Sequence, residues 1–234
     1  MRTLFTCLLM LFATDAAAQN LGGVYGPVVK ADDRSGQLRL AFVPGEDGGS
    51  DRFAARVHYQ HALSDKLRLR GVLIGSDGDD FKLRGFQGEA MLQLTPDDSA
   101  DFQAAVRFDG LIGFNGSPDQ LGINFNADQK LSERLTARGV ILFGRQFGDA
   151  RADGLLLQTR GALRYRLDGG VTLATELYNF HGRLGDGGAR DRSQLGPTVS
   201  LPLGDDVSLL GGWLFGLDRD ASDHDARIWL TSRF

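Results

Sequence analysis

The sequence is poor in the residues that hold disulfide-rich or metal-binding proteins together. Among 234 residues it has one cysteine, Cys7, and four histidines. Cys7 falls in an N-terminal region that we predict is removed, so the mature chain would have no disulfide and no thiol chemistry. The histidines are far apart in sequence, which predicts no metal site and no bound cofactor. They are His58, His61, His181 and His224.

Other absences narrow the class of protein further. After the N-terminal region, no stretch approaches the roughly eighteen consecutive apolar residues that a membrane-spanning helix needs. The sequence contains no Gly-x-Ser-x-Gly and no His-Glu-x-x-His motif, so the common hydrolase and metalloprotease signatures are missing. Lysine and arginine total 26 against 30 acidic residues, for a net charge of −4. This balance does not indicate a nucleic-acid partner.

The N-terminus has the features of a secretory signal peptide. Arg2 supplies a positive start, residues 4–12 are mostly apolar, and three alanines at 16–18 form a small-residue cleavage site before Gln19. We therefore predict that residues 1–18 are a signal peptide and that the protein is exported.

The rest of the chain alternates between apolar and polar residues, as half-exposed strands do. In the clearest stretch, Phe102, Ala104, Val106 and Phe108 alternate with Gln103, Arg107 and Asp109. Such stretches occur about twelve times, with short turns alternating with longer charged loops, which is the pattern of an up-and-down barrel. The stretch 135–147 is less regular, because Val140 and Leu142 fall on the face that should be polar. The predicted short turns are at 64–66, 96–99, 132–134, 168–170 and 204–206.

The final strand carries a resemblance to a known class. Ile228 and Leu230 form its apolar face, and it ends on Phe234. In this it resembles bacterial outer-membrane β-barrel proteins, whose last strand ends in an aromatic residue that the assembly machinery recognises. The resemblance implies an all-β, closed antiparallel transmembrane barrel of about 12 strands in the outer membrane. It also implies contact with the lipid bilayer, lipopolysaccharide and the assembly machinery, with Phe234, Leu230 and Ile228 as the assembly signal.

This interpretation gives three regions along the chain. Residues 1–18 are the signal peptide, residues 19–34 are either a periplasmic leader or a plug in the barrel, and residues 35–234 are the transmembrane barrel. A loosely packed leader is the simplest expectation for such a short terminal segment. A soluble β-sandwich or lipocalin-like barrel also alternates, but its apolar face would point inward.

If the apolar face meets lipid, the polar face lines a lumen that is rich in arginine. Arginine stays charged and offers a planar fork of donors that suits carboxylates and phosphates. Rings of arginine are one way in which a pore favours anions. The predicted lumen residues are Arg39, Arg56, Arg70, Arg107, Arg160, Arg164 and Arg227, with Glu89, Asp109 and Glu176 as the main carboxylates.

Three functions stay open at this point. We expect a porin-like channel or binding lumen for a small anionic solute, and therefore no catalytic residues. The first alternative is a structural or complex-partner barrel without transport, since polar filling and ion pairs are ordinary in barrel interiors. The second is an outer-membrane hydrolase that modifies lipids, with His58 as the histidine on the inner face.

Overall fold

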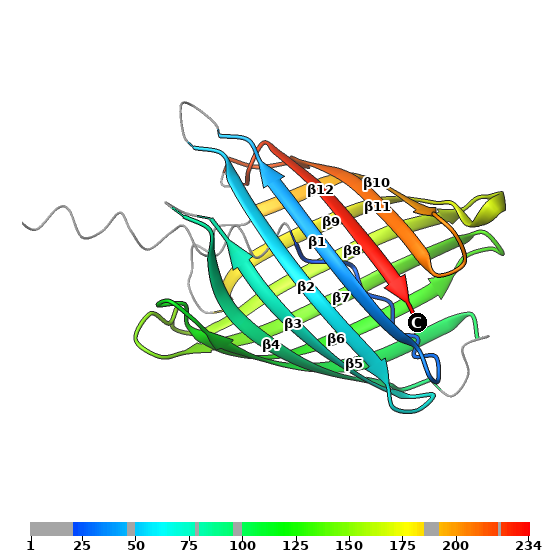
Figure 1. The fold of residues 1–234 in the computed structure, drawn as a ribbon, viewed down its shortest axis with the longest axis horizontal. Helices are drawn as coiled ribbons and strands as arrows, with labels where there is room; N and C mark the ends of the chain where they lie inside the picture. The colour runs from blue at the N-terminus through cyan, green and yellow to red at the C-terminus, as the bar shows by residue number, and fades with distance from the viewer. Residues whose placement is uncertain (1–20, 46–49, 78–79, 96–99, 185–191, 220) are drawn as a thin grey trace, which may run out of the picture.

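The computed structural model describes residues 21–45, 50–77, 80–95, 100–184, 192–219 and 221–234, and these form a single closed β-barrel (Figure 1). The predicted signal peptide and the predicted turn at 96–99 lie outside the described residues. A short 3₁₀ turn, η1 (Asp168–Gly170), joins two of the strands. The strands in the described ranges are β1 (Arg34–Val43), β2 (Arg52–Ala62), β3 (Leu67–Ser76), β4 (Lys82–Gln93), β5 (Phe102–Gly113), β6 (Asp119–Lys130), β7 (Leu135–Phe147), β8 (Leu155–Arg166), β9 (Thr172–Leu184), β10 (Arg192–Pro202), β11 (Val207–Gly216) and β12 (His224–Arg233).

Each strand pairs antiparallel with the strand before and after it in sequence, and β1 pairs with β12 to close the sheet. In that seam Leu38 lies opposite Leu230, and Ala41 lies opposite Arg227. Closure leaves no unpaired strand edge, which is the condition for a sheet to span lipid. The predicted closed up-and-down barrel of about 12 strands is confirmed.

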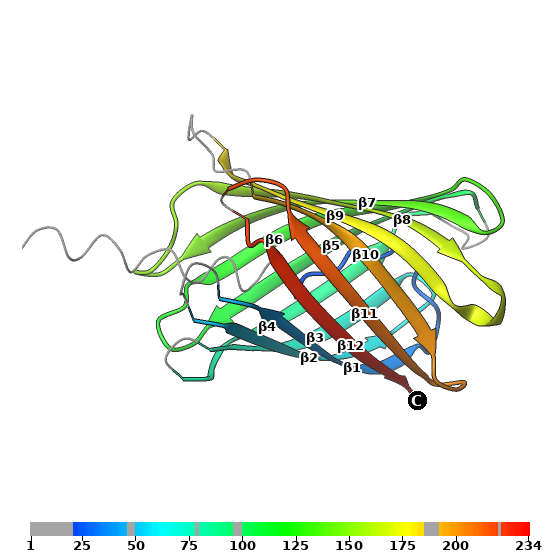
Figure 2. The same ribbon diagram turned by 90° about the horizontal axis from the view of Figure 1, so that it is seen from above.

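The two ends of the barrel differ in their connections. Short turns such as 131–134 and 167–171 lie at the end that holds the C-terminus, which we call the turn end (Figures 1 and 2). The opposite end, which we call the loop end, carries the longer connections. In the 167–171 turn, Gly169 and Gly170 have φ of 76° and 81°, a left-handed conformation that glycine adopts without steric cost.

The outer face of the sheet is apolar and its inner face is polar, as the alternation in the sequence predicts. On β1, Leu38 is 40% and Phe42 is 41% exposed, whereas Arg39 between them is 2% exposed. The same holds around the barrel, so the large apolar side chains point outward and the polar ones point into the lumen. A soluble barrel would have the reverse arrangement. In the described part of the chain, no helix is long and apolar enough to cross a membrane.

Residues 21–33, which we call the lumen segment, run inside the barrel from its middle toward the turn end, where β1 begins (Figure 1). Three of its apolar side chains are buried against small apolar patches of the inner wall. Leu21 belongs to a cluster with Ala41 and Ala54. Val29 belongs to one with Met91 and Ala105, among others.

The third patch explains the irregular β7 strand. Val24 of the lumen segment belongs to a buried cluster with Val140, Ala162, Tyr178 and Leu214, and Leu142 packs against this cluster. Val140 and Leu142 therefore break the polar pattern of the inner face because they meet an apolar side chain rather than water.

Candidate solute pathway

All ten predicted lumen residues lie on the inner wall of the barrel. Arg39, Arg70, Arg107, Arg227, Glu89 and Glu176 are buried, and Arg56, Asp109, Arg160 and Arg164 are half-buried. The lumen segment divides the space that they line into two cavities. Whether these residues bind a solute stays a prediction.

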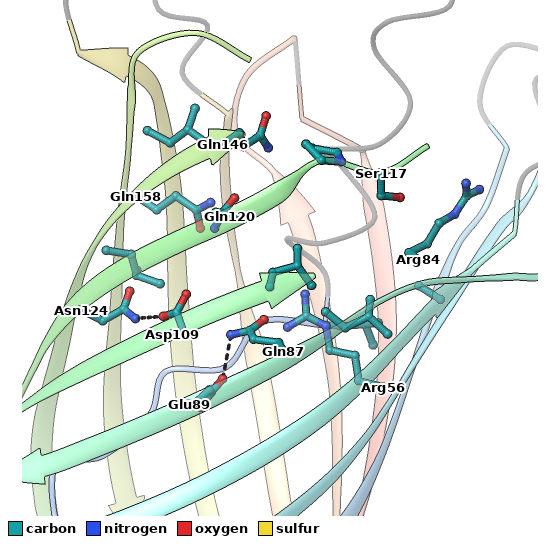
Figure 3. A pocket seen from close by; sticks show the side chains of 18 of the residues that line it. Arg56, Arg84, Gln87, Glu89, Asp109, Ser117, Gln120, Asn124, Gln146 and Gln158 are labelled. Atoms are coloured by element: carbon teal, nitrogen blue, oxygen red, sulfur yellow. Dashed lines mark hydrogen bonds between the residues drawn. The ribbon is translucent and has the colours of Figure 1, made fainter. Parts of the chain in front are cut away.

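The cavity toward the loop end has a volume of about 250 Å³. Arg56 and Arg84 reach into it from one wall, and Gln120, Gln146 and Gln158 face them from strands β6, β7 and β8 (Figure 3). The amides can donate and accept hydrogen bonds, whereas the guanidinium groups only donate. This cavity therefore combines cationic groups with neutral groups that suit hydroxyl-bearing or amide-bearing molecules.

The cavity toward the turn end has a volume of about 330 Å³. Arg39, Arg68, Arg70 and Arg164 line it, together with hydroxyl side chains such as Thr198. Among the described residues that line this cavity, Glu176 is the one carboxylate. The electrostatic potential of this cavity is therefore set mainly by arginine.

Tyr25 of the lumen segment lies between the two cavities and lines both of them. The guanidinium carbons of Arg39, Arg70 and Arg107 lie 4.9, 4.4 and 4.9 Å from the centre of its ring. Burial by itself raises the pKa of the Tyr25 hydroxyl, but the charges of Arg39, Arg70 and Arg107 outweigh it and lower that pKa. The middle of the lumen is therefore strongly electropositive.

Two groups of ion pairs neutralise part of this charge. In the first, Glu89 lies between two arginines, with its Oε2 atom 3.1 Å from Arg70 Nη1 and 3.5 Å from Arg107 Nη1. Arg107 Nε is also 3.8 Å from Asp109 Oδ1, and Asp109 accepts a hydrogen bond from Asn124 (Figure 3). These pairs join strands β3 to β6, which are neighbours in the sheet.

The second group joins strands that are further apart. Arg227 on β12 donates from Nη2 to Glu176 Oε2 on β9 over 2.5 Å and from Nη1 to the Tyr178 hydroxyl over 2.7 Å. The Tyr178 hydroxyl in turn lies 2.5 Å from Glu176 Oε2. Because Arg227 is 2% exposed and both of its Nη atoms are bonded within the protein, we regard it as part of the wall rather than as a free solute contact.

Sequence reasoning missed two kinds of lumen residue. The amides Asn124, Gln120 and Gln146 received no role, although they share the inner face with the arginines and parity alone would have placed them there. Tyr25 was missed because the residues before the first strand have no alternation that could orient them.

The structure gives no support to His58 as a catalytic base. His58 is 4% exposed in the cavity at the turn end, and its ring nitrogens have no hydrogen-bond partner among the described residues. A general base needs a partner within hydrogen-bond reach that orients it. Within the described ranges, no group of three or more histidine, cysteine or acidic residues is placed to hold a metal ion.

The predicted assembly residues lie on the outer surface. Ile228 and Leu230 are 54% and 43% exposed on β12, and Phe234 is 69% exposed. The Phe234 ring stacks on Tyr59 with the ring centres 6.2 Å apart. These three residues are therefore accessible from outside the barrel, and their role as an assembly signal stays a prediction.

No family model matches the sequence, and no curated protein matches it. Solved structures do match over most of the chain. The COG4313 outer membrane channel from Pseudomonas putida F1 has a TM-score of 0.70 and 15% identity, and the match covers 88% of this chain and 97% of that one. The NanC porin has a TM-score of 0.63 and 12% identity, covering 85% and 100%.

The KdgM porin has a TM-score of 0.62 and 11% identity, covering 86% of this chain and 99% of that one. It has also been solved in complex with disordered oligogalacturonate. At these identities the likeness establishes the fold alone. The chain therefore has the fold of bacterial outer-membrane porins and channels.

Proposed function

We propose that this protein is a porin-like channel of the bacterial outer membrane that passes or binds a small anionic solute. The observation that carries the proposal is the set of three guanidinium groups, from Arg39, Arg70 and Arg107, around Tyr25 in the middle of the lumen. Among the described residues, Glu89 and Asp109 are the carboxylates that pair with this set, so three positive charges meet two negative charges there. A narrow electropositive site in a low-dielectric wall attracts anions and repels cations.

The fold and the outer surface support the proposed location. Apolar side chains cover the outside of the closed barrel, as the hydrocarbon region of a bilayer requires. The KdgM porin, which shares the fold, has been solved with an oligogalacturonate, a carboxylate-bearing sugar chain. That complex supports an anionic solute class without identifying the solute of this protein.

Single-channel recording in planar bilayers tests the proposal. In a salt gradient, the reversal potential of the wild-type protein should show a preference for chloride over potassium. Replacing Arg107 with Gln should reduce that preference, whereas replacing the exposed Arg134 of a short turn with Gln should not. A preference for cations in the wild type would contradict the proposal.

The lumen segment favours one alternative, a barrel without transport. It fills the middle of the lumen and is anchored there by several side chains. If neither the wild type nor a variant with a displaced segment conducts above background, the structural alternative is the better description.

A further inference from the structure

The lumen segment is held by arginine side chains that bind its backbone oxygens. Arg39 Nη1 donates to the carbonyl oxygen of Leu21 over 3.0 Å, and Arg160 Nη1 donates to that of Gly23 over 3.1 Å. Arg39 is on β1 and Arg160 is on β8, on the far side of the barrel. The two guanidinium groups therefore reach the same short stretch of chain from across the lumen.

The close approach depends on glycine. A Cβ atom at Gly23 would lie 3.1 Å from Arg39 Nη1 and 3.0 Å from the Trp229 ring, and one at Gly22 would lie 2.6 Å from Arg160 Nη1. At Gly26 the added atom would meet the guanidinium group of Arg138. Side chains at these positions would push the segment and the arginines apart.

The charges of Arg39 and Arg160 are not neutralised within the described residues, where neither forms an ion pair. Besides the Leu21 carbonyl oxygen, Arg39 contacts Gln37 and the rings of Tyr25 and Trp229. Arg160 contacts Gln158 and the ring of Tyr178. Buried charges in proteins are normally paired with opposite charge, because desolvation of an unpaired ion is costly.

Two further donors at this place have no acceptor among the described residues. They are the buried Nε atom of Arg160 and the indole Nε1 atom of Trp229, whose ring lies 3.9 Å from the guanidinium carbon of Arg39. The site thus has two cations without an ion-pair partner and two hydrogen-bond donors without an acceptor. Neutral carbonyl oxygens of the segment occupy positions beside the cations that anions would fill more favourably.

We propose that Arg39 and Arg160 form a binding site for a short dicarboxylate, and that the lumen segment occupies this site when the ligand is absent. The inference rests on the proposed function and names its substrate class. The two carbonyl oxygens belong to residues two apart, so they lie within roughly 7 Å of each other. A dicarboxylate of about five carbons spans that separation with one carboxylate for each guanidinium group.

Competition between the lumen segment and the ligand predicts how much displacement of the segment should tighten ligand binding. The apparent dissociation constant of a ligand rises by the reciprocal of the fraction of protein whose site is free. If the segment is withdrawn in about one tenth of the molecules, displacing it should tighten dicarboxylate binding by about tenfold.

Fluorescence titration of the full-length barrel in detergent micelles tests the proposal independently of conduction. The chain has two tryptophans, so a Trp213→Phe background leaves Trp229 as the reporter beside Arg39. Glutarate is the probe, with butyrate as the monocarboxylate and glutaramide as the neutral control. The displacing variant is Gly23→Val with Gly26→Val, and its matched control is Gly88→Val with Gly139→Val, where an added Cβ meets nothing within 4 Å.

The displacing variant should half-saturate at about tenfold less glutarate than the matched control, and neither control compound should compete. Adding Arg39→Gln and Arg160→Gln to it should abolish the response. Exchange of the Val29 amide, which is bonded to Gln93 Oε1 over 2.7 Å, reports whether the segment has withdrawn. If the displacing variant folds poorly, Arg138→Lys, which should loosen the segment by a milder change, replaces it in the titration.

Withdrawal of the segment without tighter glutarate binding would overturn the inference, as would equal binding of butyrate. Saturable glutarate binding in a protein that carries no anion current would sustain the site and refute the channel. The two proposals can therefore fail separately.

Discussion

Arg138 on β7 and Asp128 on β6 form an ion pair through two hydrogen bonds of 2.7 Å each, from Nε and Nη2 of the arginine. The remaining Nη1 atom donates to the carbonyl oxygen of Val24 over 3.2 Å. One guanidinium group thus connects the barrel wall to the lumen segment, and its planar geometry fixes all three bonds together.

Arg138→Lys should loosen the segment without changing the charge of the lumen. A lysine ammonium is a compact donor that lacks the fork needed to hold Asp128 and Val24 at once. A loss of about 1.5 kcal/mol, typical of a hydrogen bond to a charged group, corresponds to about tenfold faster exchange of the buried Val29 amide. Hydrogen exchange followed by mass spectrometry measures this rate. Ion selectivity should stay the same, and a large change in it would show that Arg138 acts through more than geometry.

Glu89→Gln should make the lumen more selective for anions and the barrel less stable. Removing this carboxylate leaves Arg70 and Arg107 without their shared partner. Their side chains are only 7% and 4% exposed, so water cannot replace that partner. Breaking a buried pair in this way costs about 3 kcal/mol. Urea unfolding in detergent measures the stability, and reversal potentials measure the selectivity. The matched control is Glu133→Gln in an exposed turn, which should change neither quantity.

Val140→Ala should weaken the contact between β7 and the lumen segment. The change removes two methyl groups from the cluster around Val24, a loss of about 1–2 kcal/mol. Exchange of the Val29 amide should accelerate, while the barrel itself should unfold at nearly the same urea concentration. Ile141→Ala, on the neighbouring position that is 45% exposed on the outer face, should leave Val29 exchange unchanged. Equal acceleration in both variants would mean that the segment responds to general loosening of β7.

Val57→Arg tests the orientation of the outer face. Val57 is 53% exposed near the middle of β2, where an arginine facing lipid costs about 2–4 kcal/mol. Leu83→Arg, near the loop end of β4, should cost about 0–1 kcal/mol because it lies close to the membrane surface. Equilibrium unfolding from lipid vesicles gives both values. Equal and small costs would be inconsistent with a bilayer around the barrel.

Phe234→Ala should lower the amount of folded protein in the outer membrane of expressing cells. We expect this because Phe234 is the predicted assembly signal and because its exposed ring contributes one aromatic contact, with Tyr59. The same variant refolded in detergent should be nearly as stable as the wild type, with a loss of about 1 kcal/mol at most. Comparing cellular yield with the refolded stability separates recognition from folding. A loss of stability that matched the loss of yield would remove the case for a signal.

The fold could be predicted from the sequence because each strand forms backbone pairs only with its neighbours and the side-chain period is two. Alternation therefore fixed the face of every predicted lumen arginine, and the predicted turns at 132–134, 168–170 and 204–206 are found in the structure. Strand ends were predicted less well, since β1 begins at Arg34, which the sequence analysis assigned to the region before the barrel.

The contacts inside the lumen could not be predicted. Arg227 pairs with Glu176 across two intervening strands, and such a pair depends on strand tilt and barrel diameter, which alternation does not encode. The path of residues 21–33 was equally inaccessible, because Leu21, Val24 and Val29 follow no regular period. Their contacts with the wall depend on which small side chains the closed barrel brings beneath them.

Within the described ranges, the hydrogen bonds between residues 21–29 and the barrel all involve a side chain of the wall, and none of these residues forms a backbone hydrogen bond with a strand. Retraction of residues 21–29 would thus leave the inter-strand ladder unchanged. Opening and global denaturation are then two separate equilibria, and a melting temperature measured on this protein reports only the second of them.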